Sequence, residues 1–247
     1  MDFVRVDLLL VARPGVTQQA LGQGLADGAR AITSQAGGQV ALRVAIPAAG
    51  ADRAPAAAGQ ANSAAARFDA VVSSGCVAAG SVAAGSVAAA SARLSAAVTK
   101  VASGVSDLID HASSAALSGS VTVIVPGEGP YFTLYPLRRI SSMSAIQFHD
   151  YWLNQHGSLA RTLPGLSGYR QFHADPHQTA ELARTLGFGV SDFEGCAEGR
   201  RTTLSAAGVR HGPELEAVLA DEKNFIDLAR CGPTLYQAIF GSDAFGG

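Results

Sequence analysis

Residues 131–175 read YFTLYPLRRISSMSAIQFHDYWLNQHGSLARTLPGLSGYRQFHAD and contain the patterns of a strand, a helix and a second strand. Alternating side chains predict strands over Tyr131–Arg138 and Ser167–Ala174. Between them, apolar residues recur every three or four positions, which predicts a helix over Ser144–Leu163. Pro164 and Gly165 follow and are expected to end that helix.

The same stretch concentrates aromatic and imidazole groups. It holds Trp152, which is the only Trp of the chain, together with His149, His156 and His173, and His177 follows just past it. Such groups are costly to bury unless their polar ends find partners. Their concentration therefore predicts a pocket in this part of the protein.

The rest of the second half continues the pattern. A long connection follows over Asp175–Ser191, with a short helix expected over Thr179–Leu186. A strand over Asp192–Arg200, a helix over Pro213–Arg230 and a strand over Leu235–Gly241 complete the half.

The first half has the same order of elements. Strands are predicted over Val4–Ala12, Gln39–Ile46, Arg67–Ser73 and Ser120–Pro126. Helices are predicted over Thr17–Gln35 and Val77–Asp110, and a loop over Pro47–Ala66.

The order β-α-β-β-α-β, read twice, predicts an α+β protein of two tandem ferredoxin-like repeats over 1–127 and 128–247. Each repeat has one sheet face without helices. Two such faces can cover each other, so we expect an intramolecular pseudo-dimeric α+β barrel. Two independent domains are the alternative, but the Gly127–Pro130 linker is short for free domains.

Composition excludes several function classes. The net charge is −2 with no basic run, so nucleic acid is not an expected partner. The small apolar residues of Val77–Val101 favour a packed helix over a membrane span. Three separated Cys fit a reducing compartment and a cytoplasmic location. Neither a metal site nor a nucleotide-binding motif is present, so we expect no metal and no cofactor.

The motif FHDYWLNQHGSLARTLPGLSGY, beginning at Phe148, resembles the EthD family of dimeric α+β barrel proteins. The family pattern is an aromatic residue, Tyr-Trp, His, Pro-Gly and Tyr, and its matches here are Phe148, Tyr151, Trp152, His156, Pro164, Gly165 and Tyr169. The resemblance extends over roughly Phe132–Phe240. The first half lacks the motif, so it resembles a degenerate copy, and we expect one site built mainly by the second half.

Spacing and resemblance together nominate site residues. His156 lies one helical turn from Trp152, and an imidazole beside an indole in a dry site is a candidate acid or base. A structural His156 is the alternative. Strand alternation adds polar and aromatic groups that we expect to face the barrel interior. The predicted catalytic residues are His156, Tyr169 and His173, and the predicted substrate-binding residues are Tyr135, His149, Trp152 and Glu198.

The resemblance implies small cofactor-free decarboxylases, cyclases, lactone isomerases and monooxygenases acting on aromatic or polyketide-like compounds. We therefore expect a lyase or an isomerase/cyclase with a hydrophobic substrate held inside the barrel. The alternatives are a non-catalytic small-molecule-binding accessory protein and a haem-linked monooxygenase, with haem held by His156 or His173. The chain is expected to work as a pseudo-dimeric monomer or to associate as a homodimer.

Overall fold

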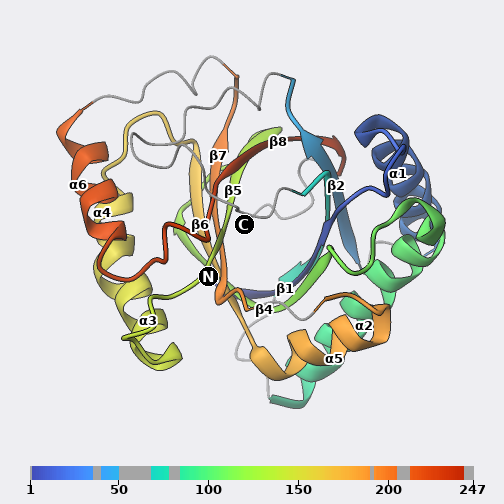
Figure 1. Ribbon diagram of the computed structural model, residues 1–247, viewed down its shortest axis with the longest axis horizontal. Coiled ribbons are helices and arrows are strands. Elements are labelled where there is room, and N and C mark those ends of the chain that lie inside the picture. The colour runs from blue at the N-terminus through green and yellow to red at the C-terminus, as the bar shows by residue number, and fades with distance from the viewer. Residues whose placement is uncertain are drawn as a thin grey trace.

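The computed structural model describes residues 2–35, 40–49, 68–77, 84–189, 192–204 and 212–241. Eight antiparallel strands form a closed barrel in the order β1-β3-β2-β8-β5-β7-β6-β4 (Figure 1). The strands are β1 (Asp2–Leu10), β2 (Ala41–Pro47), β3 (Ala70–Val77), β4 (Ala115–Val125), β5 (Tyr131–Leu137), β6 (Gly168–Ala174), β7 (Gly195–Arg201) and β8 (Thr234–Phe240). The predicted α+β barrel is confirmed.

Helices cover the barrel on two opposite sides (Figure 1). One side carries α1 (Gln18–Gln35), α2 (Ala84–Ser103) and α5 (Pro176–Leu186), and the other carries α3 (Ala145–Tyr151), α4 (Gly157–Ala160) and α6 (Pro213–Glu222). A π-helical turn, η3 (Trp152–His156), joins α3 to α4, and a short 3-10 turn, η2 (Ser106–Leu108), follows α2. The helix predicted over Ser144–Leu163 is therefore continuous but widened at its centre.

Local sequence signals explain where the site helices begin. Ser144 and Gln147 form a capping box at the start of α3, each side chain bonding the other residue's backbone N–H. Asp175 caps α5 by accepting from the backbone N–H of Gln178. Gly187 ends α5 in the left-handed conformation, with φ of 66°, where glycine has no steric penalty.

Each half of the chain contributes a continuous run of four strands. The first half supplies β4-β1-β3-β2 and the second half supplies β8-β5-β7-β6, which is the same relative order. The pairs β2–β8 and β4–β6 join the two runs and close the barrel.

The linker between the halves is packed tightly against the second half. A Cβ atom at Gly127 would lie 1.5 Å from the carbonyl oxygen of Ser167, and one at Gly129 would lie 2.1 Å from that of Arg201. Only glycine fits either position. These close approaches therefore fix the path of the linker along the second half.

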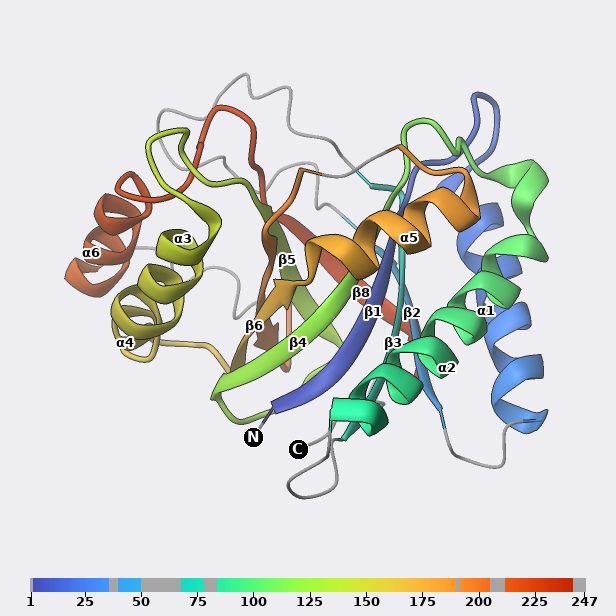
Figure 2. The same cartoon turned by 90° about the horizontal axis from the view of Figure 1, so that it is seen from below.

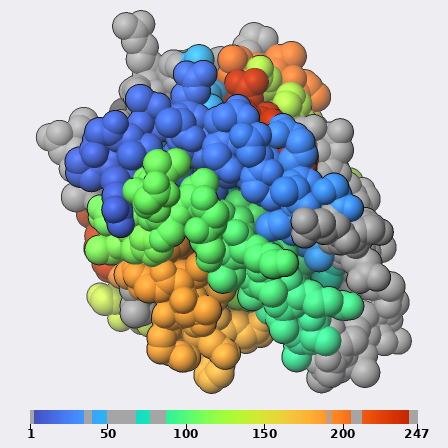
Figure 3. Space-filling model, turned by 90° about the vertical axis from the view of Figure 1, so that its right-hand side faces the viewer, coloured from blue at the N-terminus to red at the C-terminus, as the bar shows by residue number. Residues whose placement is uncertain are grey.

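Helix α5 belongs to the second half in sequence but packs on the first half. Its residues Leu182, Ala183 and Leu186 join the buried cluster formed by α1, α2 and their strands. Figure 2 shows α5 lying across β4 and β1, and Figure 3 shows α1, α2 and α5 as one continuous surface. The two halves are thus interleaved as well as joined.

Several boundaries differ from the sequence prediction. Strand β3 begins later, at Ala70, and β4 begins earlier, at Ala115. Helix α6 ends at Glu222, well before Arg230. Most of the predicted loop 47–66 and the first turns of the predicted helix 77–110 lie outside the described residues. Among the helices that are described, none combines the length and apolar character needed to cross a bilayer.

Candidate active site

A pocket of about 1600 Å³ lies outside the barrel, over the β4–β6 seam between α3 and α5. We call it the α3–α5 pocket. Its apolar wall includes Ile140, Ile146 and Leu153, and Ile146 is 83% exposed. An exposed large apolar side chain at a pocket favours an apolar ligand. The sequence placed the pocket inside the barrel instead.

Two predicted site residues meet at this pocket. His149 comes from α3 and His173 from β6, and their Nδ1 atoms lie 2.9 Å apart in a hydrogen bond. Nε2 of His149 lies 3.5 Å from Glu194 Oε2, and the other carboxylate oxygen is 2.8 Å from Nε of Arg139. Glu194 also lines the pocket and was not among the predicted site residues.

Both rings of the pair are half-buried. Desolvation, and then the nearby charge of His149, lower the pKa of His173 to about 4. The ring is therefore neutral near pH 7 and can accept or donate a hydrogen bond. The indole of Trp152 packs beside it, with 4.5 Å between ring centroids. Trp152 thus forms an apolar support for the His pair and is itself fully buried.

His156, the predicted catalytic base, lies elsewhere. Its Nδ1 is 2.8 Å from Oδ2 of Asp221, whose Oδ1 accepts from the hydroxyl of Tyr151 at 2.5 Å. The ring packs against Phe225 between η3 and α6, at 4.9 Å between centroids. Burial lowers the pKa of His156, and the Asp221 carboxylate opposes that shift. His156 is not among the residues that line the α3–α5 pocket.

The two predicted tyrosines also face the helices. Tyr135 packs with Phe148 and Trp152 beneath α3, and Tyr169 packs with Ala160 of α4. Burial raises the pKa of Tyr169 to about 12. Neither phenol faces the barrel interior, contrary to the expectation from the sequence. The structure thus separates Tyr135 and Tyr169 from Glu198, which does face inward.

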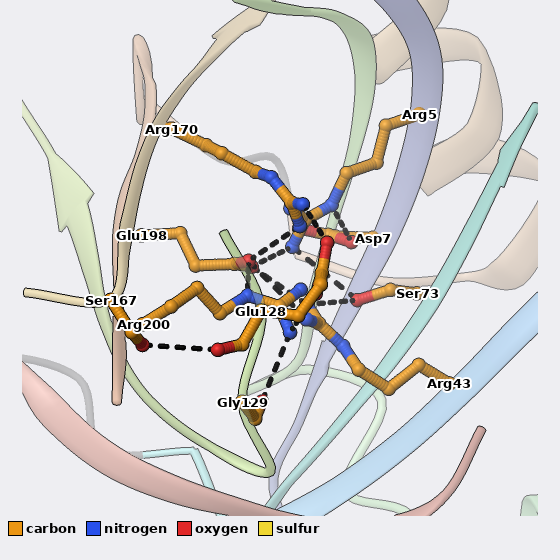
Figure 4. Close-up of polar contacts among 10 residues, drawn as sticks. All are labelled: Arg5, Asp7, Arg43, Ser73, Glu128, Gly129, Ser167, Arg170, Glu198 and Arg200. Carbon is orange, nitrogen blue, oxygen red and sulfur yellow. Dashed lines mark hydrogen bonds and ion pairs between the residues drawn. The ribbon is translucent and has the colours of Figure 1, made fainter. Parts of the chain in front are cut away.

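The barrel interior holds a network of ion pairs (Figure 4). Fully buried Glu198 accepts from Arg43 Nη2 at 2.7 Å and from Arg200 Nε at 2.6 Å. Nη2 of Arg5 lies 2.8 Å from the same carboxylate, and Nε of Arg5 donates to Asp7 at 2.8 Å. Burial alone would raise the pKa of Glu198, but Arg200, Arg43 and Arg5 hold it well below its usual range.

A second carboxylate closes one end of this network. Glu128, from the loop between β4 and β5, pairs with Arg170 and lies 3.0 Å from Nη1 of Arg200. The guanidinium of Arg43 lies 4.0 Å from the ring centroid of Phe132, within cation–π range. Charges and aromatic rings therefore occupy the interior layer that we expected to hold a substrate.

The interior arginines were not predicted from the sequence. The available signal was charge at alternate strand positions, as in Arg5 and Asp7 of β1 and Glu198 and Arg200 of β7. Charges spaced by two on a strand point to one face. In the described part of the chain, no group of three or more His, Cys, Asp or Glu side chains is arranged to hold a metal ion.

Residues 141–229 match the family model described as EthD domain. No curated protein matches the chain. A candidate monooxygenase from Lactobacillus acidophilus NCFM is similar over 96% of this chain and 93% of its own, with a TM-score of 0.52 and 7% identity. An anthrone oxidase-like protein is similar over 100% and 96%, with a TM-score of 0.52 and 10% identity. At these identities the likeness shows the fold alone.

Proposed function

We propose that the protein is a cofactor-independent enzyme of the lyase or isomerase/cyclase type, on the ground that residues 141–229 match the EthD domain model. Its substrate is a hydrophobic aromatic or polyketide-like compound. The site is the α3–α5 pocket, and the barrel interior is the scaffold that supports it. The observation that carries this proposal is the hydrogen-bonded His149–His173 pair beside Glu194 at the pocket wall.

The pair suits proton transfer at carbon or at a phenolic oxygen. His149 reaches the pocket with one ring nitrogen held by His173 and the other directed at Glu194. An imidazole carries both a donor and an acceptor nitrogen when neutral, so it can take up a proton at one atom and release one at another. Removing a proton next to a carbonyl yields an enolate, and the same imidazolium can return the proton to another atom. Dehydration, cyclisation and isomerisation all use this removal and return of a proton. Decarboxylation uses only the return of a proton to carbon.

The other predicted residues take supporting roles in this proposal. Trp152 packs behind His173, while His156, held by Asp221, anchors η3 against α6. Tyr169 stays protonated and buried beneath α4. Glu198 pairs with Arg170 and so holds β7, which begins directly after Glu194, beside β6, which carries His173. The catalytic role predicted for His156 therefore passes to His149, with His173 retained.

Haem does not fit the two histidines that the sequence offered for it. Both ring nitrogens of His173 are engaged, Nδ1 by His149 and Nε2 by the Gln171 side chain at 3.3 Å. His156 packs between η3 and α6, and the α3–α5 pocket does not reach it. Oxidation at the proposed site, as the names of the similar structures suggest, would proceed by deprotonation of the substrate followed by its reaction with oxygen.

The registers also support two repeats, 1–127 and 128–247, in one pseudo-dimeric chain. Arg43 of β2 pairs with Ser73 of β3, and at the corresponding place Arg170 of β6 pairs with Glu198 of β7. One copy of the chain would then supply both sheets of the barrel. A molar mass of one chain by light scattering would support this proposal. A mass of two chains would indicate a homodimer that forms through a contact outside the barrel.

The test is a panel of phenolic, lactone and polyketide acids, followed by mass spectrometry with and without oxygen. The variants are His149→Gln and, as a matched control, exposed His177→Gln. We expect turnover by the wild type and by the control, and a loss of at least about 100-fold in His149→Gln with ligand affinity retained. Binding without turnover across the panel would favour the accessory-protein alternative. Product formed only with oxygen would favour oxidation.

A further inference from the structure

A buried amide stands behind the His pair. Gln171 lies on β6, two residues before His173, and is fully buried. Its Nε2 donates to the backbone oxygen of Trp152 at 2.8 Å, and its Oε1 lies 3.3 Å from Nε2 of His173. One side chain thus connects the helix backbone to the imidazole.

The π-helical turn makes that backbone oxygen available. In η3 the N–H of Gly157 bonds to the oxygen of Trp152, five residues earlier. A carbonyl oxygen has two lone pairs, so it can also accept from Gln171. A Cβ at position 157 would lie 3.2 Å from Nε2 of Gln171, so the glycine makes room for the amide. π-Helical turns occur often at functional sites.

The donors and acceptors along this connection fix the protons. A carbonyl oxygen only accepts, so the Gln171 NH₂ group faces Trp152 and the amide oxygen faces His173. The amide oxygen also only accepts, so Nε2 of His173 carries the proton. In a neutral ring, Nδ1 of His173 is then an acceptor, and Nδ1 of His149 must donate to it. This leaves Nε2 of His149, facing Glu194, as the nitrogen that can gain or lose a proton.

We propose that Gln171 is a positioning residue that sets the proton positions of the His149–His173 pair and makes Nε2 of His149 the atom that exchanges a proton with the substrate. The claim that Nε2 of His149 exchanges a proton with a substrate rests on the proposed function. The proton positions do not, because they follow from contacts within the protein alone.

The test reads the tautomers directly by ¹⁵N NMR of the imidazoles near pH 7. In the wild type we expect His173 with its proton on Nε2 and His149 protonated on Nδ1. Gln171→Leu removes the acceptor, and we expect His173 to become a mixture of tautomers. Gln155→Leu makes the same change at an exposed position of η3, and its spectrum should match the wild type. Gly157→Ala should displace the amide and shift the tautomers in the direction of Gln171→Leu.

A second variant covers the case in which Gln171→Leu does not fold. Gln171→Glu keeps an acceptor oxygen for His173 Nε2 whether the new carboxyl group is ionised or protonated, so we expect the Nε2–H form to persist. A wild-type His173 protonated on Nδ1 would overturn the proposal. So would a folded Gln171→Leu with unchanged tautomers, or a Gln171→Glu that loses the Nε2–H form. If the tautomers behave as expected but no substrate turns over, the positioning inference stands and the enzyme proposal fails.

Discussion

Nδ1 of His149 and Nδ1 of His173 share one hydrogen bond, 2.9 Å long. One of the two atoms must be the acceptor, so the rings cannot both be fully protonated while the bond exists. Burial and the charge of His149 lower the pKa of His173 to about 4, which identifies His173 as the ring that stays neutral. The pair therefore carries at most one positive charge over most of the physiological range.

The free energy of unfolding should depend on pH through His173. Its folded pKa is about 4 against an ordinary value of 6.5, so the unfolded chain takes up the proton first as the pH falls. This contribution to stability is present above pH 6.5 and is lost as the pH falls through about 4, with a total on the order of 3 kcal/mol. His173→Gln should flatten the dependence in urea unfolding at pH 7, 5.5 and 4.5. Exposed His177→Gln is the control and should keep the pH dependence of the wild type. If the free energy of unfolding fell between pH 7 and 4.5 by the same amount in His173→Gln as in the wild type, this account would be contradicted.

Removing the interior carboxylate should destabilise the barrel. Glu198→Gln leaves Arg5, Arg43 and Arg200 buried beside a neutral amide, and breaking such a buried pair costs about 3–5 kcal/mol. Glu128→Gln is the matched comparison and should cost less, because the Glu128 side chain is 27% exposed. Urea unfolding at pH 7 measures both. Salt screens exposed charges far more than buried ones. If high salt restored the free energy of unfolding of Glu198→Gln to the wild-type value, the prediction would be contradicted.

Strand alternation predicted which side chains share a face, but it did not predict which face is inside. Tyr169 and His173 were correctly placed opposite Arg170, yet they face the helices and Arg170 faces the barrel interior. In a barrel covered by helices both faces of a strand are buried, so polarity alone does not separate them. The paired charges of Arg5 and Asp7 on one strand were the better indicator of the interior.

Partners that lie far away in the sequence could not be predicted. His156 meets Asp221, 65 positions later, and His149 meets His173 from a different element. A single sequence gives the period of each helix and strand, but the packing of one helix against another depends on the whole fold. Glu194 was therefore not chosen as a site residue, although the predicted strand Asp192–Arg200 contains it.

Glu222 on α6 should make the protein less stable as the pH rises. Burial, and then the charge of Asp221, raise the pKa of Glu222 to about 7 from an ordinary 4.5. The folded protein holds this proton more tightly than the unfolded chain, so stability falls between pH 4.5 and about 7, by an amount on the order of 3 kcal/mol. Glu222→Gln should raise the melting temperature at pH 8 and leave it nearly unchanged at pH 4.5. The exposed neighbour Glu214 gives the control, Glu214→Gln, which should have no such pH dependence.

Substitutions of His156 and of His149 should have opposite effects on stability and on turnover. His156→Gln breaks the bond to Asp221 and the packing on Phe225, so we expect a loss of about 1–3 kcal/mol in the free energy of unfolding. Asp221→Asn should show a smaller loss of the same kind. Because His156 does not line the α3–α5 pocket, turnover by the folded variant should change by less than about 10-fold, and its pH profile should match the wild type. His149→Gln should show the reverse, with stability kept and turnover lost. If His156→Gln instead abolishes turnover in a protein of unchanged stability, the chemistry belongs to the His156–Asp221 pair, as the sequence first suggested.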